Sequence, residues 1–114
     1  MSRHAPSYLK THRKRLGLSQ RELAALLGCR SETLVSRYER LARKPSLEVA
    51  VACQVIFDAP LDEVFPGIYA PVEKAVLDRA LRLAKALERD EESPLTEHKR
   101  RALRAIIARA SRVR

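Results

Sequence analysis

The chain has 114 residues, which suits one compact core with a helical extension and leaves no room for a second large domain. Aromatic residues make up only 4%, and the helix formers Ala, Leu, Arg, Lys and Glu dominate, so we predict an all-α fold. The 23 Lys and Arg against 14 Asp and Glu give a formal net charge of +9. This charge favours a polyanionic partner, and nucleic acid is a more common partner of this kind than an anionic membrane. The alternative is a basic surface that is simply solvated.

The basic residues are unevenly distributed along the chain. Residues 1–44 carry eleven Lys and Arg and three acidic residues, whereas residues 45–66 carry no Lys or Arg and four acidic residues. The first ten residues contain no apolar stretch of signal-peptide length, and no run approaches the roughly 18 apolar residues of a membrane span. The two cysteines, Cys29 and Cys53, form neither a disulfide framework nor a metal-like spacing. We therefore expect a cytoplasmic protein with no membrane partner.

The first 30 residues predict a short arm and two helices. Residues 1–6 are expected to form a flexible arm, and a helix then runs from Ser7 until Gly17 ends it. A capping box opens the second helix, because the Ser19 hydroxyl can accept from the third backbone N–H while Glu22 reaches back to Ser19. Gly28 suits the left-handed conformation that closes this helix.

The third predicted helix, from Glu32 to about residue 42, has two different faces. One face is apolar, and the opposite face is polar and basic. The apolar residues are Leu34, Val35, Tyr38 and Leu41, and the polar ones are Thr33, Ser36, Arg37 and Arg40. After Lys44-Pro45-Ser46 we expect an almost wholly apolar helix over residues 47–57, and then a short helix over residues 61–65 that Pro66-Gly67 ends.

Residues 69–114 predict a C-terminal helical hairpin, set apart from a domain at residues 7–68. Its two helices carry apolar stripes on either side of an acidic turn at residues 90–94. The stripes are Val72, Val76, Ala80, Leu83 and Leu87, then Leu103, Ile106, Ile107, Ala110 and Val113. The stripes could form an intramolecular core, a dimer contact or a surface for a protein partner, and we favour the intermolecular roles.

Two short helices joined by a Gly-containing turn, the second with a basic outer face, are the sequence form of a helix-turn-helix. Four motifs resemble the Cro/C1-type (XRE-like) family of phage repressors and related regulators, in family order and nearly at family spacing. These are GLSQRELA from Gly17, VSRYER from Val35, PSL from Pro45 and LDEVF from Leu61. The resemblance covers about 60 residues and implies a five-helix, lambda-repressor-like domain whose second and third helices bind DNA.

The resemblance also implies roles for individual residues. Gln20 matches a position that touches the DNA backbone, Thr33 and Ser36 match base-facing positions, and Arg37 and Arg43 match positions near the backbone. Arg13 and Glu39 match an ion pair linking the first and third helices. For Thr33 and Ser36, an ordinary solvated face is an equal alternative. The full set of candidate DNA-binding residues is Gln20, Arg30, Glu32, Thr33, Ser36, Arg37, Arg40, Arg43 and Lys44.

Two departures from the family pattern affect the third helix. One extra residue, Arg30, lies in the turn before the third helix and affects the pitch of this helix relative to the family pattern. The usual Gly after Arg40 is replaced by Leu41, so we expect the helix to run on further. Glu32 at its start suits the helix dipole, and it could accept from cytosine N4 or simply repel phosphates.

The sequence contains no Gly-rich phosphate loop, nucleophile elbow, paired-carboxylate motif or metal-ligand spacing. We expect no catalysis, no cofactor and no metal site, and we interpret Cys29 and Cys53 as small core residues. The predicted function is sequence-specific binding of double-stranded DNA by a repressor-like transcriptional regulator, as a homodimer. The alternative is an antitoxin-like or adaptor module whose residues 69–114 hold a protein partner.

Overall fold

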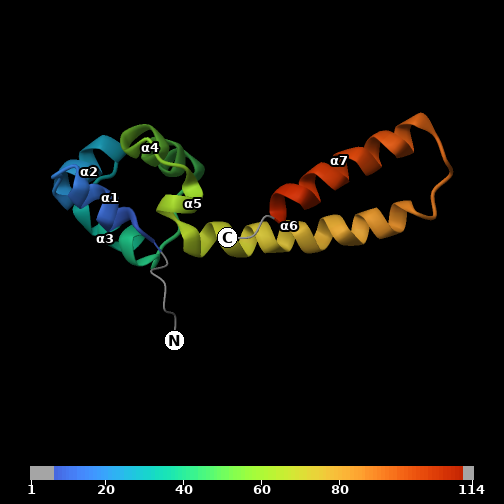
Figure 1. The fold of residues 1–114 in the computed structure, drawn as a ribbon. Coiled ribbons are helices and arrows are strands. Elements are labelled where there is room, and N and C mark those ends of the chain that lie inside the picture. Colours follow the sequence, from blue (N-terminus) through green and yellow to red (C-terminus); the bar gives the residue numbers. More distant parts are fainter. Residues whose placement is uncertain (1–6, 112–114) are drawn as a thin grey trace. The chain divides into compact units, whose positions relative to one another are not determined.

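The computed structural model describes residues 7–111, and every regular element in that range is an α-helix (Figure 1). The all-α prediction is therefore confirmed. The predicted arm at residues 1–6 and the stripe residue at 113 lie outside the described residues. The helices are α1 (Leu9–Arg15), α2 (Gln20–Leu27), α3 (Glu32–Arg40), α4 (Leu47–Phe57), α5 (Leu61–Val64), α6 (Pro66–Leu87) and α7 (Pro94–Ala110).

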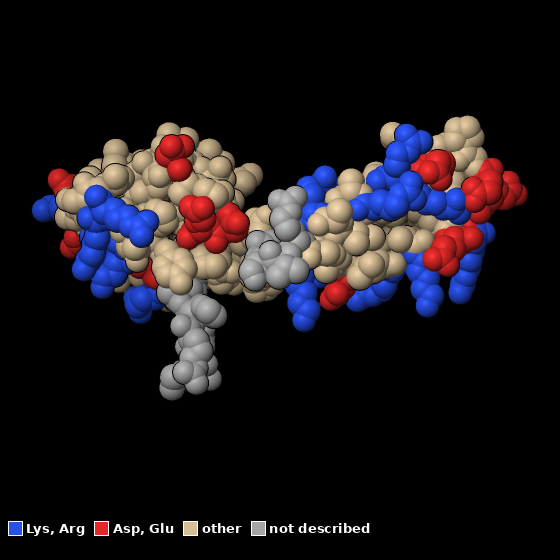
Figure 2. Space-filling model, in the orientation of Figure 1, with Lys and Arg blue, Asp and Glu red and all other residues tan. Residues whose placement is uncertain are grey.

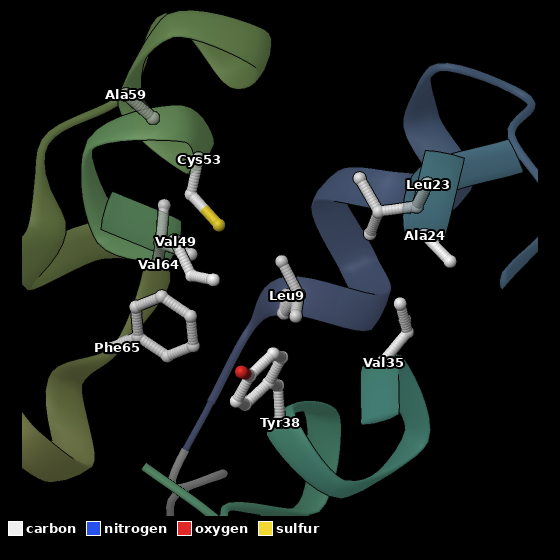
Figure 3. Packing of buried hydrophobic residues seen from close by; sticks show 10 residues of the cluster. All are labelled: Leu9, Leu23, Ala24, Val35, Tyr38, Val49, Cys53, Ala59, Val64 and Phe65. Atoms are coloured by element: carbon white, nitrogen blue, oxygen red, sulfur yellow. The ribbon is translucent and has the colours of Figure 1, made fainter. Parts of the chain in front are cut away.

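The chain divides between Ala70 and Pro71 into two compact units, each described here by itself. We call residues 7–70 the N-terminal unit and residues 71–111 the C-terminal hairpin. In the N-terminal unit, each of the first five helices contributes one fully buried side chain to a single core (Figure 3). These five are Leu9, Leu23, Val35, Cys53 and Val64. Burial of one such apolar side chain contributes about 1.5–3 kcal/mol, so the core fixes all five helices together.

The capping box predicted at the start of α2 is confirmed. Ser19 Oγ accepts from the Glu22 backbone N–H at 3.0 Å, and the Glu22 carboxylate accepts from the Ser19 backbone N–H at 2.9 Å. The hydrogen bond from the Ser19 backbone N–H to the carboxylate, and after it the interaction of the carboxylate with the Ser19 side chain, lower the pKa of Glu22. Gly28 closes the helix in the left-handed conformation with φ 74°. The start and the end of α2 are therefore each determined by residues within three positions of that end.

The predicted extension of the third helix is wrong, because α3 ends at Arg40 although Leu41 replaces glycine there. Leu41 itself adopts the left-handed conformation with φ 52°, and the Ala42 N–H donates to the Arg37 carbonyl at 2.9 Å. This closes the helix as a glycine would. The Leu41 side chain packs against the core, which offsets the roughly 1–2 kcal/mol that a left-handed residue with a Cβ costs.

We expect Leu41→Gly to be more stable than Leu41→Ala by about 0.5–1 kcal/mol, because both lose the leucine packing but only glycine is unstrained at this φ. Urea unfolding followed by circular dichroism measures the difference. Gln54, exposed in the middle of α4, is the control position. There alanine should be the more stable of the two, by about 1 kcal/mol. The same order at both positions would contradict the left-handed assignment of Leu41.

The predicted short helix does end before Pro66, since α5 stops at Val64, but the next helix starts earlier than predicted, because α6 begins at Pro66 and runs through Pro71 to Leu87. Proline is well suited to the first helical position, where its missing N–H has no intrahelical acceptor. The Tyr69 N–H donates to the Phe65 carbonyl at 3.0 Å and starts the helical bonding immediately. Pro71 removes one further backbone bond, and the helix persists across it.

The C-terminal hairpin consists of the antiparallel α6 and α7, joined by a short turn (Figure 1). Its core is small, with Ala80, Leu87 and Leu103 buried and Ala84, Ile106 and Ile107 packed against them. Arg100 closes the turn, since it donates to the Leu87 carbonyl at 2.9 Å and to the Glu92 carboxylate at 2.8 Å. Helix α7 begins at Pro94, the last residue of the predicted turn, because Ser93 accepts from the Thr96 N–H and caps it.

Candidate nucleic-acid interface

Helices α2 and α3 form a close pair joined by the four-residue turn from Gly28 to Ser31. Cys29 packs against the core, and its backbone N–H donates to the Ala24 carbonyl at 2.8 Å. Arg30, the extra residue of the turn, is exposed. The added residue is therefore accommodated on the outside of the turn, while its neighbour Cys29 holds the turn to the core.

The two predicted faces of α3 are both present. Val35 is fully buried and Tyr38 is 4% exposed, while Leu34 packs against the core at its edge. On the other side Glu32, Thr33, Arg37 and Arg40 are exposed, and Ser36 is half-buried. The polar face is accessible over the whole length of the helix, and the apolar face anchors it.

A buried polar cluster connects α1, α2 and α3. Arg13 Nε donates to Glu39 Oε2 at 2.6 Å, and the two side chains are 9% and 6% exposed. Arg13 also donates through Nη1 to the Leu18 carbonyl at 2.9 Å. The other carboxylate oxygen, Glu39 Oε1, accepts from Gln20 Nε2 at 2.9 Å. Both oxygens of Glu39 are therefore bonded, and the carboxylate fixes α3 against the two preceding helices.

Gln20 thus has a structural partner, which the sequence did not indicate. Its side chain is half-buried, and its amide nitrogen is directed at Glu39 at the far end of α3. The family resemblance implies that Gln20 also contacts the DNA backbone. Because one N–H of its side-chain amide already donates to Glu39, the other N–H or the amide oxygen would have to make that contact. This hydrogen bond holds the start of α2 beside α3, so Gln20 positions the helix pair whether or not it touches DNA.

Basic side chains gather over α1–α3, and acidic ones lie over α4 and α5 (Figure 2). Arg30, Arg37, Arg40, Arg43 and Lys44, all candidates from the sequence, are exposed. Residues 45–66, which form α4 and α5, contain four acidic residues and no Lys or Arg. A polyanion is therefore attracted to the side that carries the polar face of α3 and repelled by the opposite side.

One exposed cation beside the candidate residues was missed in the sequence. Arg21 lines an open hollow of about 490 Å³ together with Cys29, Arg30 and Glu32, at the junction of α2 and α3. The signal was present, because Leu23, Ala24 and Leu27 give α2 its apolar side and leave Arg21 on the outer one. Arg21 and Arg30 therefore lie around the same hollow as Glu32, at the start of α3.

The described residues offer little other chemistry. Burial raises the pKa of Cys53 to about 12, and burial also raises the pKa of Cys29, so both thiols stay protonated at neutral pH. Residues 7–111 contain no cluster of three side chains able to hold a metal ion. No helix in the same range has the length and apolarity needed to cross a bilayer.

Comparison with known proteins gives one match. The family model described as helix-turn-helix matches residues 9–64, a segment that begins with α1 and ends with α5. No curated protein and no solved structure matches the chain significantly. The match contains the polar cluster, the α2–α3 pair and the exposed face of α3.

Proposed function

The chain belongs, through residues 9–64, to the Cro/C1-type helix-turn-helix family of DNA-binding transcription regulators, and we propose that it is a sequence-specific, repressor-like regulator that binds its operator as a homodimer. The observation that carries this proposal is the polar face of α3, which is exposed along the helix while the other face is buried. An α-helix fits the B-DNA major groove, and residues near its start reach base edges. We propose that the protein acts in the cytoplasm. Its effect comes from occupying DNA rather than from catalysis.

The candidate residues divide into two groups with different tasks. Thr33 and Ser36 have short side chains and lie on the outward side of α3. When α3 lies in the major groove, these side chains come within reach of the base edges. The surrounding cations, Arg37, Arg40, Arg43 and Lys44 with Arg21 and Arg30, contact phosphates. Phosphate contacts supply affinity and orientation, whereas base contacts supply specificity.

Homodimerisation would follow from the geometry of DNA. Two copies related by a two-fold axis present two copies of α3 about one helical turn apart, roughly 34–36 Å, to a palindromic site. A single α3 touches too few base pairs to define an operator, because each mismatched pair costs only about 1–3 kcal/mol. A dimer doubles the number of base pairs that are recognised.

Thr33→Ala tests the base-reading part of the proposal. After binding-site selection with the purified chain, we expect this variant to lose about 5- to 50-fold in affinity for the selected duplex and little for random DNA, as expected for a lost base contact. Thr11→Ala is the matched control, because Thr11 is exposed on α1, outside the α2–α3 pair, and lines a hollow with Asp62 and Glu63 of α5. Equal losses on selected and random DNA would remove Thr33 from the base-reading residues.

A second candidate function is favoured by the large apolar side chains exposed on α6 and α7, such as Leu81 at 48% and Leu95 at 61%. In an antitoxin-like or adaptor protein, residues 69–114 would bind a different protein, and the DNA-binding domain would be auxiliary. A stable complex of defined stoichiometry with one co-expressed partner, together with a monomeric free chain, would favour this function over the homodimeric regulator.

A further inference from the structure

The C-terminal hairpin leaves part of its apolar surface uncovered. Val72, Val76 and Leu83 are 55%, 41% and 53% exposed. Their spacing of four and seven residues places them within about 40° of one another around the α6 axis. They lie beside Ala80 and Leu87, which pack with α7. The apolar stripe of α6 is therefore wider than α7 covers.

An apolar hollow continues this surface onto α7. It has a volume of about 330 Å³ and is lined by Leu83, Leu87, Leu103, Ala102 and a single charged residue, Lys99. Leu83 belongs both to the exposed stripe and to the wall of the hollow. We call the surface formed by Val72, Val76, Leu83 and Ala102 the hairpin face.

The core of the hairpin is small for two long helices. Only Ala80, Leu87 and Leu103 are buried in it, and one of these is an alanine. Only Ala84, Ile106 and Ile107 pack against these three, so the hairpin buries little apolar surface for its length. An opposing layer over the hairpin face would bury more apolar surface and stabilise the two helices further.

The charges along the hairpin favour a second copy as that layer. Residues 88–97, around the turn, carry five acidic residues and one Arg, whereas residues 98–111 carry five basic residues and no acidic one. Figure 2 shows the acidic side chains gathered at the turn end. Glu88, Asp90 and Glu91 are exposed there, and Arg109 is exposed near the opposite end. Of these basic residues, Arg104 and Arg109 lie away from the turn, so two antiparallel hairpins would place the acidic turn of each against the Arg104–Arg109 part of the other.

Helix α4 also exposes an apolar row, but its charges oppose self-association. Leu47, Val51 and Val55 are 79%, 53% and 78% exposed. The flanking charged residues of this segment are all acidic, with no Lys or Arg from residue 45 to residue 66. Two copies joined through this row would bring carboxylates together, which is unfavourable. The same row therefore serves as a control surface.

We propose that the hairpin face packs against the same face of a second copy, with the hairpins antiparallel, to form a four-helix bundle that is the dimer contact. This deepens the proposed function, since it names the surface of the homodimer invoked there. The contact is isologous, so each side chain of the face appears twice across the two-fold axis.

Sedimentation equilibrium of the full chain without DNA tests the proposal. The wild type should be dimeric, and Leu83→Glu and Val76→Glu should each weaken dimerisation by about 100-fold, because symmetry places two carboxylates in one apolar contact. Val55→Glu makes the same change on the exposed row of α4 and should leave the dimer intact. Circular dichroism must show unchanged helix content in all three variants, which is expected because the substituted side chains are at least 41% exposed.

Orientation is tested separately by Asp90→Lys with Glu91→Lys. This double variant should weaken an antiparallel dimer by about tenfold, whereas no change would contradict the antiparallel arrangement. A monomeric wild type, or a dimer that survives Leu83→Glu and Val76→Glu, would overturn the proposed contact. Loss of the dimer in Val55→Glu alone would assign the contact to α4. Because no DNA is present, these outcomes are independent of whether the chain binds an operator.

Discussion

Glu39→Ala is expected to destabilise the N-terminal unit by about 3–5 kcal/mol, the cost of leaving a buried charge without its partner. Glu39 accepts from Arg13 at 2.6 Å and from Gln20 at 2.9 Å, and its side chain is 6% exposed. Removing it leaves the Arg13 guanidinium buried with only the Leu18 carbonyl as acceptor. Since small domains have total stabilities of about 5–15 kcal/mol, this loss is a large fraction of the stability of the unit.

Chemical denaturation of the full chain measures this effect, with Glu63→Ala as the control. Glu63 is an exposed acidic residue in α5, and its loss should change the stability by no more than about 0.5 kcal/mol. The double variant Arg13→Met with Glu39→Met should be more stable than either single variant, because no uncompensated charge remains. Additive losses in the double variant would show that the two residues act independently and contradict the account of the cluster.

Arg37→Glu is expected to reduce affinity for DNA of every sequence by about 10- to 100-fold at low salt, because it removes a phosphate contact and adds a repulsive charge. Arg37 is exposed on α3, one helical turn after Thr33. The slope of log affinity against log salt concentration should become shallower by about 0.9 for the lost contact. Fluorescence anisotropy with labelled duplexes over a salt series gives both quantities.

Lys85→Glu makes the same change in net charge on α6, away from the N-terminal unit in sequence and outside residues 88–111, whose charges are assigned to the dimer contact. It should leave the salt slope unchanged and weaken binding by no more than about threefold through long-range electrostatics. If both variants lose affinity equally, net charge rather than a contact by Arg37 accounts for binding. The phosphate-contacting role proposed for that residue would then be wrong.

Local signals predicted the N-terminal unit well because its helix boundaries are encoded in a few adjacent residues. The Ser19–Glu22 box and Gly28 are examples in which the side chain or the φ angle that ends a helix is visible in the sequence. The periodicity of α3 also separated Val35 and Tyr38, which are buried, from Thr33 and Arg37, which are exposed. In both cases neighbouring residues determine the helix boundary or the buried face, so residues far away in the sequence do not change it.

The errors arose where packing overrides local preference. Leu41 has no intrinsic tendency to end a helix, yet its side chain packs on the core in a left-handed conformation that periodicity cannot indicate. The predicted hairpin begins at residue 69, but its first helix starts at Pro66 and continues across Pro71, because packing and backbone bonding keep the helix intact there. The hydrogen bond from Gln20 to Glu39 joins residues 19 positions apart in the sequence, and it forms only because the fold places α2 beside α3. Such features require the tertiary structure.

If the exposed face of α3 is the surface that meets DNA, amide chemical-shift mapping of the full chain will locate the contact there. On titration with a selected duplex, we predict the largest perturbations from Arg30 to Arg37, covering the turn and the first half of α3. The acidic segment at residues 45–66 should change little. Perturbations confined to α4, α5 or the C-terminal hairpin, with α3 unchanged, would contradict the account.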